Sequence, residues 1–245
     1  EIKKSKGIVR GKNDKTDAKD ISFYSYRNID KLKLFQPIEK DIQKLKLLYT
    51  EREKVLKSLL LLEKTKENYP FTSKDVYKEI ASLNQSLINT LKKAISKLEQ
   101  KIKEIIKSNE KLNKQYQLIK SIAGIGEQTS VYLIITTKGF TAFKNWRQFA
   151  CYSGVAPFEY SSGTSIKGRT KVNHMADKKM KSLLDLSAKT AIQYDKELRE
   201  YYLKRTEAGK SKMSTINVVR NKILYRMFAV INRQTPFLKN YLLAA

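Results

Sequence analysis

The sequence contains very few of the residues that build disulfide frameworks and transition-metal sites. Among its 245 residues there is one cysteine, Cys151, and one histidine, His174. Zinc fingers and disulfide scaffolds need several such side chains, so both classes are excluded. We expect Cys151 to be a small core residue, because it lies in an apolar and aromatic run, and His174 to be a packed or solvated bystander.

Long apolar runs are also absent. The longest, residues 59–62 and 131–135, are much shorter than the roughly 20 residues that cross a bilayer, and no signal-like leader opens the chain. The apolar fraction of 41% is still sufficient for a globular core. We expect a cytoplasmic, nucleoid-associated protein without a membrane partner.

Acidic residues are too few to balance the basic ones. Fifty lysines and arginines stand against 24 aspartates and glutamates, which gives a formal net charge of +26 and a pI near 9.9. A lysine-rich composition explains part of this excess, but not the shortage of acids. Because the positive charge is spread over every segment, nucleic acid is a better partner than a membrane surface, and binding should weaken with salt.

Composition divides the chain into residues 1–36, 37–116 and 117–245. The middle segment has a long, charged helical pattern broken near Pro70, with Thr72 or Ser73 as the cap of the restart. We expect a mainly α fold, in which a helical hairpin or coiled coil precedes a compact helical domain. The apolar stripe of the second arm needs a partner, either the first arm or another subunit of a dimer or tetramer. It comprises Leu83, Leu87, Leu91, Ala94, Leu98, Ile102 and Ile105.

Acidic residues recur every three positions near the N-terminus, at Asp14, Asp17 and Asp20. On a helix they would lie near one face, where two carboxylates one turn apart can share a hard cation such as Mg²⁺. The alternative is helix capping, in which acids in the first turn oppose the positive end of the helix dipole.

A Gly-x-Gly turn, Gly124-Ile125-Gly126, separates two apolar helical patterns and has the form of a helix-hairpin-helix motif. In that motif the glycines expose backbone N–H groups to a phosphate. A tight turn between two helices, without any DNA contact, explains the same pattern.

Five aromatic residues at three-residue steps, Phe140, Phe143, Trp146, Phe149 and Tyr152, predict a helical face that belongs to the core.

An irregular loop is expected next, at residues 154–171, where Ser161 and Ser162 are followed by Lys167, Arg169 and Lys171. A serine among cations suits phosphoryl transfer, because Lys and Arg stabilise the charge that develops on phosphorus. An ordinary surface turn has a similar composition.

Three further helices are expected at residues 177–193, 195–208 and 212–234, with apolar stripes that pack together. Their basic outer faces would track a sugar-phosphate backbone or simply be solvated. The basic residues are Lys178, Lys179, Lys181, Arg199, Lys204, Arg205, Arg220, Lys222 and Arg226.

The order of these motifs resembles the DEDD-serine insertion-sequence transposases, a family related to the Piv DNA invertase that includes bridge-RNA-guided recombinases. The resemblance covers nearly the whole chain. Its most specific parts are Asp14-Lys15-Thr16-Asp17-Ala18 and the block from Pro157 to Gly163.

The resemblance implies a function and a site. Residues 1–36 would be the end of a RuvC-like domain that binds Mg²⁺ through four acids, of which Asp14 and Asp17 match the last two. The first two acids, and most of that domain, would precede Glu1. Residues 37–116 would be a spacer for dimerisation, and residues 117–245 the transposase domain.

In that domain Ser162 resembles the nucleophile, whereas Ser161 stands where many members have glutamine. The chain would therefore be a DNA transposase or recombinase, with DNA, a guide RNA and further copies of itself as partners. The rival interpretations are a nucleic-acid-binding module without catalysis, an inactive fragment, and a helical scaffold.

Overall fold

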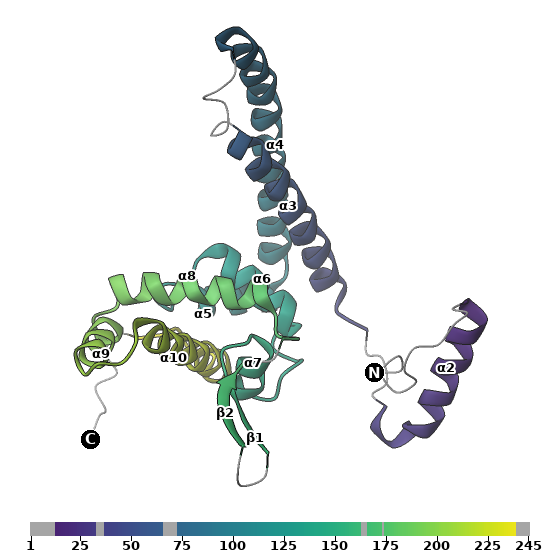
Figure 1. Ribbon diagram of the computed structural model, residues 1–245, viewed down its shortest axis with the longest axis vertical. Coiled ribbons are helices and arrows are strands. Elements are labelled where there is room, and N and C mark those ends of the chain that lie inside the picture. Colours follow the sequence, from purple (N-terminus) through teal and green to yellow (C-terminus); the bar gives the residue numbers. More distant parts are fainter. Residues whose placement is uncertain (1–12, 33–36, 66–72, 163–165, 173, 239–245) are drawn as a thin grey trace. The chain divides into compact units, whose positions relative to one another are not determined.

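The computed structural model describes residues 13–32, 37–65, 73–162, 166–172 and 174–238, which are mainly helical, as the sequence predicts (Figure 1). The chain divides into two compact units, residues 1–38 and residues 39–245. The elements are α2 Asp14–Arg27, η1 Ile29–Lys31, α3 Lys40–Thr65, α4 Lys74–Ser108, α5 Glu110–Lys120, α6 Glu127–Thr137, α7 Trp146–Tyr152, β1 Phe158–Ser162, β2 Ile166–Lys171, α8 Lys178–Tyr194, α9 Lys196–Glu207 and α10 Lys212–Arg233. None of the described helices is long and apolar enough to cross a membrane.

The first unit contains helix α2, which begins with a capping box. The side-chain oxygen of Asn13 accepts a hydrogen bond from the backbone N–H of Thr16 at 2.8 Å, and the Thr16 hydroxyl accepts one from the N–H of Asn13 at 3.2 Å. Both bonds satisfy N–H groups that a helix start leaves without intrahelical partners. No residue of α2 is buried.

In the second unit, α3 and α4 lie side by side and form an arm that extends from the helical body (Figure 1). Its seam buries Ile42, Leu45, Tyr49 and Leu59 of α3 and Ile88, Ile102 and Ile106 of α4. Salt bridges Arg52–Glu99, at 2.7 Å, and Lys92–Glu63, at 3.0 Å, connect the two helices. The prediction that the first arm is a partner of the second is therefore confirmed.

The predicted apolar stripe is wrong at its outer end. Leu83 and Leu87 are 69% and 54% exposed, whereas Ile88 is buried. The reason is the spacing: Ile88 lies two heptads before Ile102, so the seam follows a heptad and not the eleven-residue repeat. Ser73 precedes α4 as expected, but its side chain makes no capping hydrogen bond.

The second arm ends at Asn109, before the Tyr116 limit that the sequence suggests. Asn109 leaves the helical conformation, with φ −110° and ψ 107°, and its side-chain oxygen caps α5 by accepting from Leu112 N–H at 3.1 Å. Its amide nitrogen donates to the carboxylates of Glu39 and Asp41, each at 3.0 Å. Asn109 therefore joins the start of α3, the end of α4 and the start of α5.

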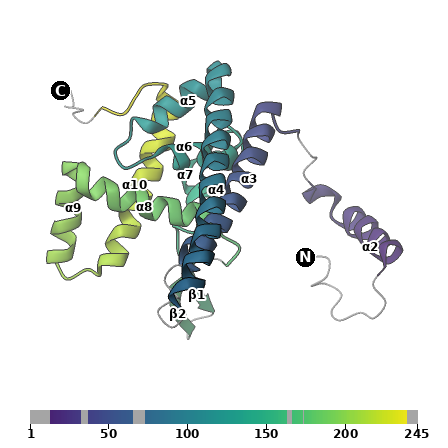
Figure 2. The ribbon, with the colours of Figure 1, turned by 90° about the horizontal axis from the view of Figure 1, so that it is seen from above.

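The helical body packs α5, α6, α8, α9 and α10 around one core, with α7 against α10 (Figure 2). Ile119, Leu133, Leu184 and Ile223 are completely buried in it. The three predicted C-terminal helices are confirmed to within a residue or two at their ends. They start after Asp177, Asp195 and Ser211, whose side chains accept a hydrogen bond from the first turn.

The five aromatic residues before the hairpin form a cluster, but not one helical face. Phe140 has φ +64° and lies in a turn, and α7 begins only at Trp146. Phe149 is fully buried, with ring centroids 5.0 Å from Phe143 and 5.8 Å from Tyr152. The predicted core role is thus confirmed for Phe149 but not for the exposed Tyr152, and the predicted periodicity is wrong. Cys151 is half-buried.

Candidate functional site

The segment that carries Ser161 and Ser162 is a β-hairpin, so the prediction of an irregular loop is wrong. β1 pairs antiparallel with β2, with Ser161 opposite Lys167 and Ser162 opposite Ile166. The serines and glycines suggested a turn, but the strands also contain the β-branched and aromatic residues that favour extended backbone. Ser162 is the last residue of β1.

The candidate phosphate ligands Lys167, Arg169 and Lys171 occupy alternate positions of β2. Backbone pairing therefore keeps them on the strand next to Ser162. In Figure 1 the hairpin extends away from the helices, at the end of the body that contains α7.

The base of the hairpin is packed closely, and Gly154 makes this packing possible. Gly154 has φ +67°, and a Cβ atom added to it would lie 2.9 Å from the Cβ of Ala176 and 3.1 Å from Cγ1 of Val172. One residue beyond Gly154, the carbonyl of Val155 accepts a hydrogen bond from the Asn217 side chain at 2.8 Å. The segments before β1 and after β2 are therefore fixed against each other and against α10.

A polar cluster lies where the chain leaves β2 and enters α8. The carboxylate of Asp177 caps α8 through Met180 N–H at 2.9 Å. It also accepts hydrogen bonds from the hydroxyls of Tyr132, at 2.9 Å, and Tyr152, at 3.3 Å. The backbone N–H of Asp177 donates to the carbonyl of Tyr152 at 2.8 Å. We call Asp177, Tyr132 and Tyr152 the Asp177 cluster; it joins α6, α7 and α8 beside the hairpin.

Burial and the adjacent carboxylate raise the pKa of both phenols in the Asp177 cluster above the ordinary value. Burial also raises the pKa of Tyr49, whose ring centroid lies 5.2 Å from that of Tyr132. Tyr132 and Tyr152 therefore keep their protons at neutral pH and act as donors to Asp177. Sequence reasoning missed this cluster, although Asp177 before a helical pattern is an N-cap signal.

Arg220 does not lie on an outer face, so its expected position is wrong. The side chain is only 6% exposed and forms an ion pair with Asp185 of α8, and it donates to Asn217 at 3.3 Å. Burial opposes the ionisation of Asp185, but hydrogen bonds from Lys189 and Arg220 lower its pKa below the ordinary value. Arg220 thus connects α10 to α8.

Arg226 also differs from the expected solvated basic face, whereas Arg199 is exposed as expected. Arg226 is buried and pairs with Asp195 at 2.7 Å. Arg199 donates to backbone carbonyls near the end of α8, those of Ile192 and Gln193. Arg226 thus pairs with acids inside the protein, and Arg199 binds the end of α8 at its surface.

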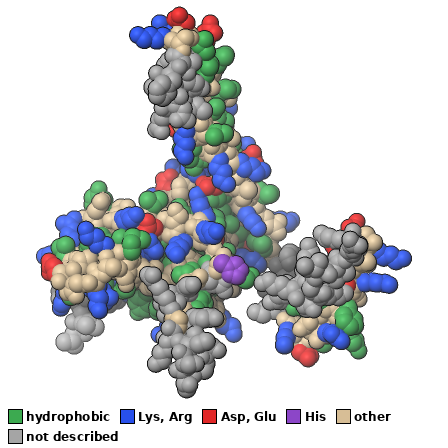
Figure 3. Space-filling view, viewed as in Figure 1, with side chains coloured by type: hydrophobic (Ala, Val, Ile, Leu, Met, Phe, Trp, Pro, Cys, Tyr) green, Lys and Arg blue, Asp and Glu red, His purple; other side chains and the backbone are tan. Residues whose placement is uncertain are grey.

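Lys178 and Lys181, in the first turn of α8, are accessible as predicted: the first is exposed and the second half-buried. They follow Asp177 directly and so lie close to the base of the hairpin. Lysines and arginines are spread over the face of the body and arm in Figure 3. Nucleic-acid contact by Lys178 and Lys181 stays a prediction.

The Gly-x-Gly turn has two unlike glycines. Gly124 has φ +88°, and a Cβ there would lie 2.3 Å from the carbonyl oxygen of Ser187 and 2.7 Å from the nitrogen of Ala191. Close packing against α8 thus explains Gly124. Gly126 is exposed and is the N-cap of α6. The first residue of that helix is Glu127, whose carboxylate forms an ion pair with Lys103 at 2.9 Å. The carboxylate weakens the attraction of this helix start for a phosphate, and DNA contact at Gly126 stays a prediction.

Asp14 and Asp17 both lie in the first turn of α2. This position fits helix capping. Carboxylate oxygens are also the ligands that Mg²⁺ prefers, since it is usually bound by one or two carboxylates together with substrate phosphates. Among the residues that the structure describes, no group of three or more His, Cys, Asp or Glu side chains could hold a metal. The two aspartates alone are therefore a partial donor set.

The serine hairpin and the Asp177 cluster lie within a segment that has known relatives. Residues 116–203 match the model of the transposase IS116/IS110/IS902 family. The chain is also 29% identical over 235 residues to pilin gene-inverting proteins of Moraxella bovis and Moraxella lacunata. Each alignment covers 96% of this chain and 70% of the relative.

A shorter match concerns an insertion element. The chain is 28% identical over 118 residues to the insertion element IS110 uncharacterized 43.6 kDa protein of Streptomyces coelicolor. This alignment covers 48% of this chain and 29% of that protein. Residues 116–203, the transposase-like segment, contain α6, α7, the hairpin and α8. The comparisons support DNA transposition or recombination as the functional class.

Proposed function

We propose that the chain catalyses DNA strand exchange, with the Ser162 hydroxyl as nucleophile. Support comes from the position of Ser162 at the end of β1, within the transposase-like segment and next to the strand that carries Lys167, Arg169 and Lys171. The similarity to gene-inverting proteins over nearly the whole chain adds to it.

The proposed step conserves one phosphoester bond. The Ser162 oxygen forms a bond to a backbone phosphorus, the bond from phosphorus to one deoxyribose oxygen breaks, and that oxygen leaves as a hydroxyl with the proton that serine gives up. A hydroxyl from another strand then reverses the step and releases serine. Because one bond replaces another, rejoining needs no nucleotide cofactor.

The cations of β2 would stabilise the extra negative charge on phosphorus. Asp14 and Asp17 would hold Mg²⁺, which when bound adds further charge neutralisation. Lys178 and Lys181 would contact neighbouring phosphates. A guide RNA is included as a second partner because the resemblance to RNA-guided recombinases implies one, and the exposed leucines of the arm fit oligomer assembly.

A covalent trap tests the nucleophile. The protein is incubated with Mg²⁺ and plasmid DNA, and the reaction is stopped with denaturant. Nuclease then removes the unbound DNA, a protease digests the protein, and the peptide that contains Ser161 and Ser162 is analysed by mass spectrometry. We expect a nucleotide adduct on Ser162 in the unchanged protein and in the matched control Ser161→Ala. Ser162→Ala should lose the adduct and keep its DNA affinity.

An adduct that persists in Ser162→Ala, or that forms on another residue, removes Ser162 from the mechanism. DNA binding without any adduct, with or without RNA from the source cells, favours a binding module. Asp14→Asn and Asp17→Asn should lower the adduct yield at equal DNA affinity, and unchanged yields would remove these carboxylates from the proposal.

A further inference from the structure

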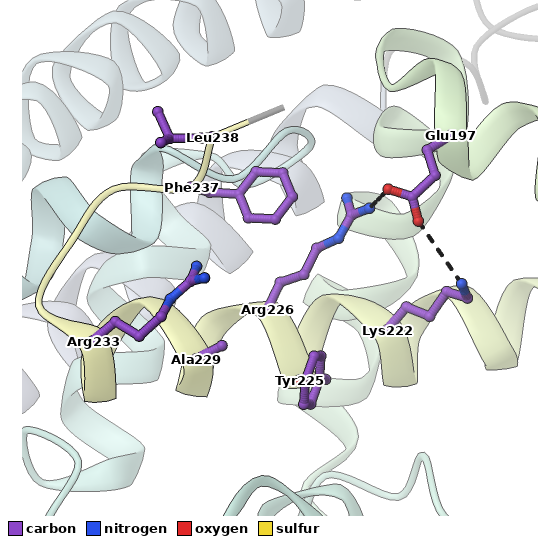
Figure 4. Close-up of a pocket in the computed structure, with 8 residues that line it drawn as sticks. All are labelled: Glu197, Lys222, Tyr225, Arg226, Ala229, Arg233, Phe237 and Leu238. Atoms are coloured by element: carbon purple, nitrogen blue, oxygen red, sulfur yellow. Dashed lines mark hydrogen bonds and ion pairs between the residues drawn. The ribbon is translucent and has the colours of Figure 1, made fainter. Parts of the chain in front are cut away.

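A pocket beside α10 combines cationic and aromatic side chains that the proposed serine chemistry does not use. Its volume is about 340 Å³, within the range of about 300–1,000 Å³ that is usual for ligand sites. We call it the α10 pocket. Glu197 of α9, Lys222, Tyr225, Arg226, Ala229 and Arg233 of α10, and Phe237 and Leu238 beyond α10 line it (Figure 4).

One side of the α10 pocket is fixed by buried contacts. The guanidinium of Arg226 pairs with Asp195 at 2.7 Å and with Glu197 at 2.6 Å, and it lies 4.5 Å from the ring centroid of Phe237. The backbone N–H of Phe237 donates to the Ser121 hydroxyl at 2.7 Å. These contacts hold the segment after α10 in place, so the pocket is formed before any ligand arrives.

The charge of the lining favours an anion. The lining contains three cations, Lys222, Arg226 and Arg233, and one acid, Glu197, while Asp195 pairs with Arg226 from behind the lining. Glu197 lies 4.0 Å from the Lys222 ammonium, a loose ion pair, and its side chain is 65% exposed. Successive phosphates of a strand would gain the attraction of Lys222 and of Arg233, at the cost of repulsion from Glu197.

The apolar part of the lining continues toward the hairpin. Tyr225 is 57% exposed, and its ring meets Trp146 of α7 edge to face, with centroids 6.0 Å apart. The guanidinium of Arg147 lies 5.6 Å from the Trp146 ring. Since α7 leads into Gly154 and the hairpin, aromatic and cationic side chains connect the pocket with the helix that precedes Ser162.

Alternating aromatic and cationic groups are the usual surface for single-stranded nucleic acid, in which bases stack on rings while Lys and Arg bind phosphates. We propose that the α10 pocket binds an unpaired nucleotide of such a strand, with its base against Tyr225 and the phosphates on either side of it near Lys222 and near Arg233. A base inside a duplex is stacked and cannot enter. The inference rests on the nucleic-acid binding of the proposed function, but not on Ser162.

Fluorescence anisotropy tests the pocket with a single strand of about 12 nucleotides, as DNA and as RNA, and with duplex DNA of the same sequence. Tyr225→Ala is compared with Tyr194→Ala, an exposed tyrosine at the end of α8. Lys222→Gln and Arg233→Gln together are compared with Lys57→Gln and Lys97→Gln together, which remove the same charge from exposed positions of the arm. A nucleoside monophosphate serves as competitor.

We expect Tyr225→Ala to weaken single-strand binding about tenfold, as loss of one stacked base does, with little change for the duplex. The double pocket variant should reduce the slope of log affinity against log salt by about 1.4, two charges at ~0.7 each. Glu197→Gln should strengthen binding, a change that damage to the fold would not produce.

If the pocket variants bind single strands as tightly as their matched controls do, the inference is overturned. The result of the covalent trap on Ser162 does not depend on this outcome. A different outcome is that the nucleoside monophosphate saturates the unchanged protein at lower concentrations than it saturates the α10 pocket variants. The ligand is then a free nucleotide, and the proposal that the pocket binds a strand is overturned. Absence of all nucleic-acid binding by the unchanged protein overturns the proposed function as well.

Discussion

Gly124→Ala separates packing from phosphate contact at the Gly-x-Gly turn. An L-residue at φ +88° costs roughly 1–2 kcal/mol. The new methyl group would also lie 2.3 Å from a backbone oxygen of Ser187, and overpacking against such a neighbour costs about 1–3 kcal/mol. The sum is about 2–5 kcal/mol, which for a protein of this size lowers the melting temperature by about 4–20 °C.

Two other glycines provide matched controls. Gly209 also has a positive φ, +76°, but no atom within 4 Å of an added Cβ, so Gly209→Ala should show only the backbone cost of roughly 1–2 kcal/mol. Gly126 has φ −89° and open space, so Gly126→Ala should cost less than about 1 kcal/mol. The free energy of unfolding is measured for all three by denaturant titration. Equal losses for Gly124→Ala and Gly209→Ala would refute the packing argument.

Arg220→Gln should destabilise the fold by about 1–3 kcal/mol, because Asp185 loses its buried partner and keeps only Lys189, whereas Lys178→Gln should change stability by less than about 0.5 kcal/mol; denaturant titration of both variants checks this, and similar losses would contradict it. Asp177→Ala should lower stability by about 1–3 kcal/mol through the lost cap and the lost hydrogen bonds of two phenol hydroxyls, of which that of Tyr132 is part-buried, and calorimetry beside Asp177→Asn, which keeps the cap, measures it. Burial raises the pKa of Tyr116 to about 12, so its contribution to stability is present below about pH 10 and lost as the pH rises toward 12. Absorbance titration against Tyr116→Phe should show one fewer phenol ionising late, and an unchanged curve would contradict the shift.

Local sequence signals predicted the helices well and the strands poorly. Asp177, Asp195 and Ser211 each precede an apolar helical pattern, and N-cap chemistry acts within one turn, so these helix starts were readable. The hairpin was missed because serine and glycine dominated the interpretation of the segment. Strand pairing depends on residues that face one another across the turn, and the pattern along one strand does not reveal it.

The candidate site was predicted in part. The serines and the cations of β2 lie on neighbouring strands, close to where the sequence placed them. The burial of Arg220 depends on Asp185, 35 positions earlier in the chain, and the Asp177 cluster depends on Tyr132, 45 positions earlier. Such pairings come from tertiary packing, which local periodicity does not contain. Metal binding, RNA guidance and oligomeric state stay predictions.

The junction at Asn109 sets the direction in which the arm points. Helix α4 has 35 residues, a length of about 52 Å at 1.5 Å per residue. A tilt of ~5° at the junction would displace the far end by about 4.5 Å, roughly the rise of three residues. The two hydrogen bonds from the Asn109 amide to Glu39 and Asp41 therefore lie at the base of the arm, where a small change of angle produces a large displacement of its far end.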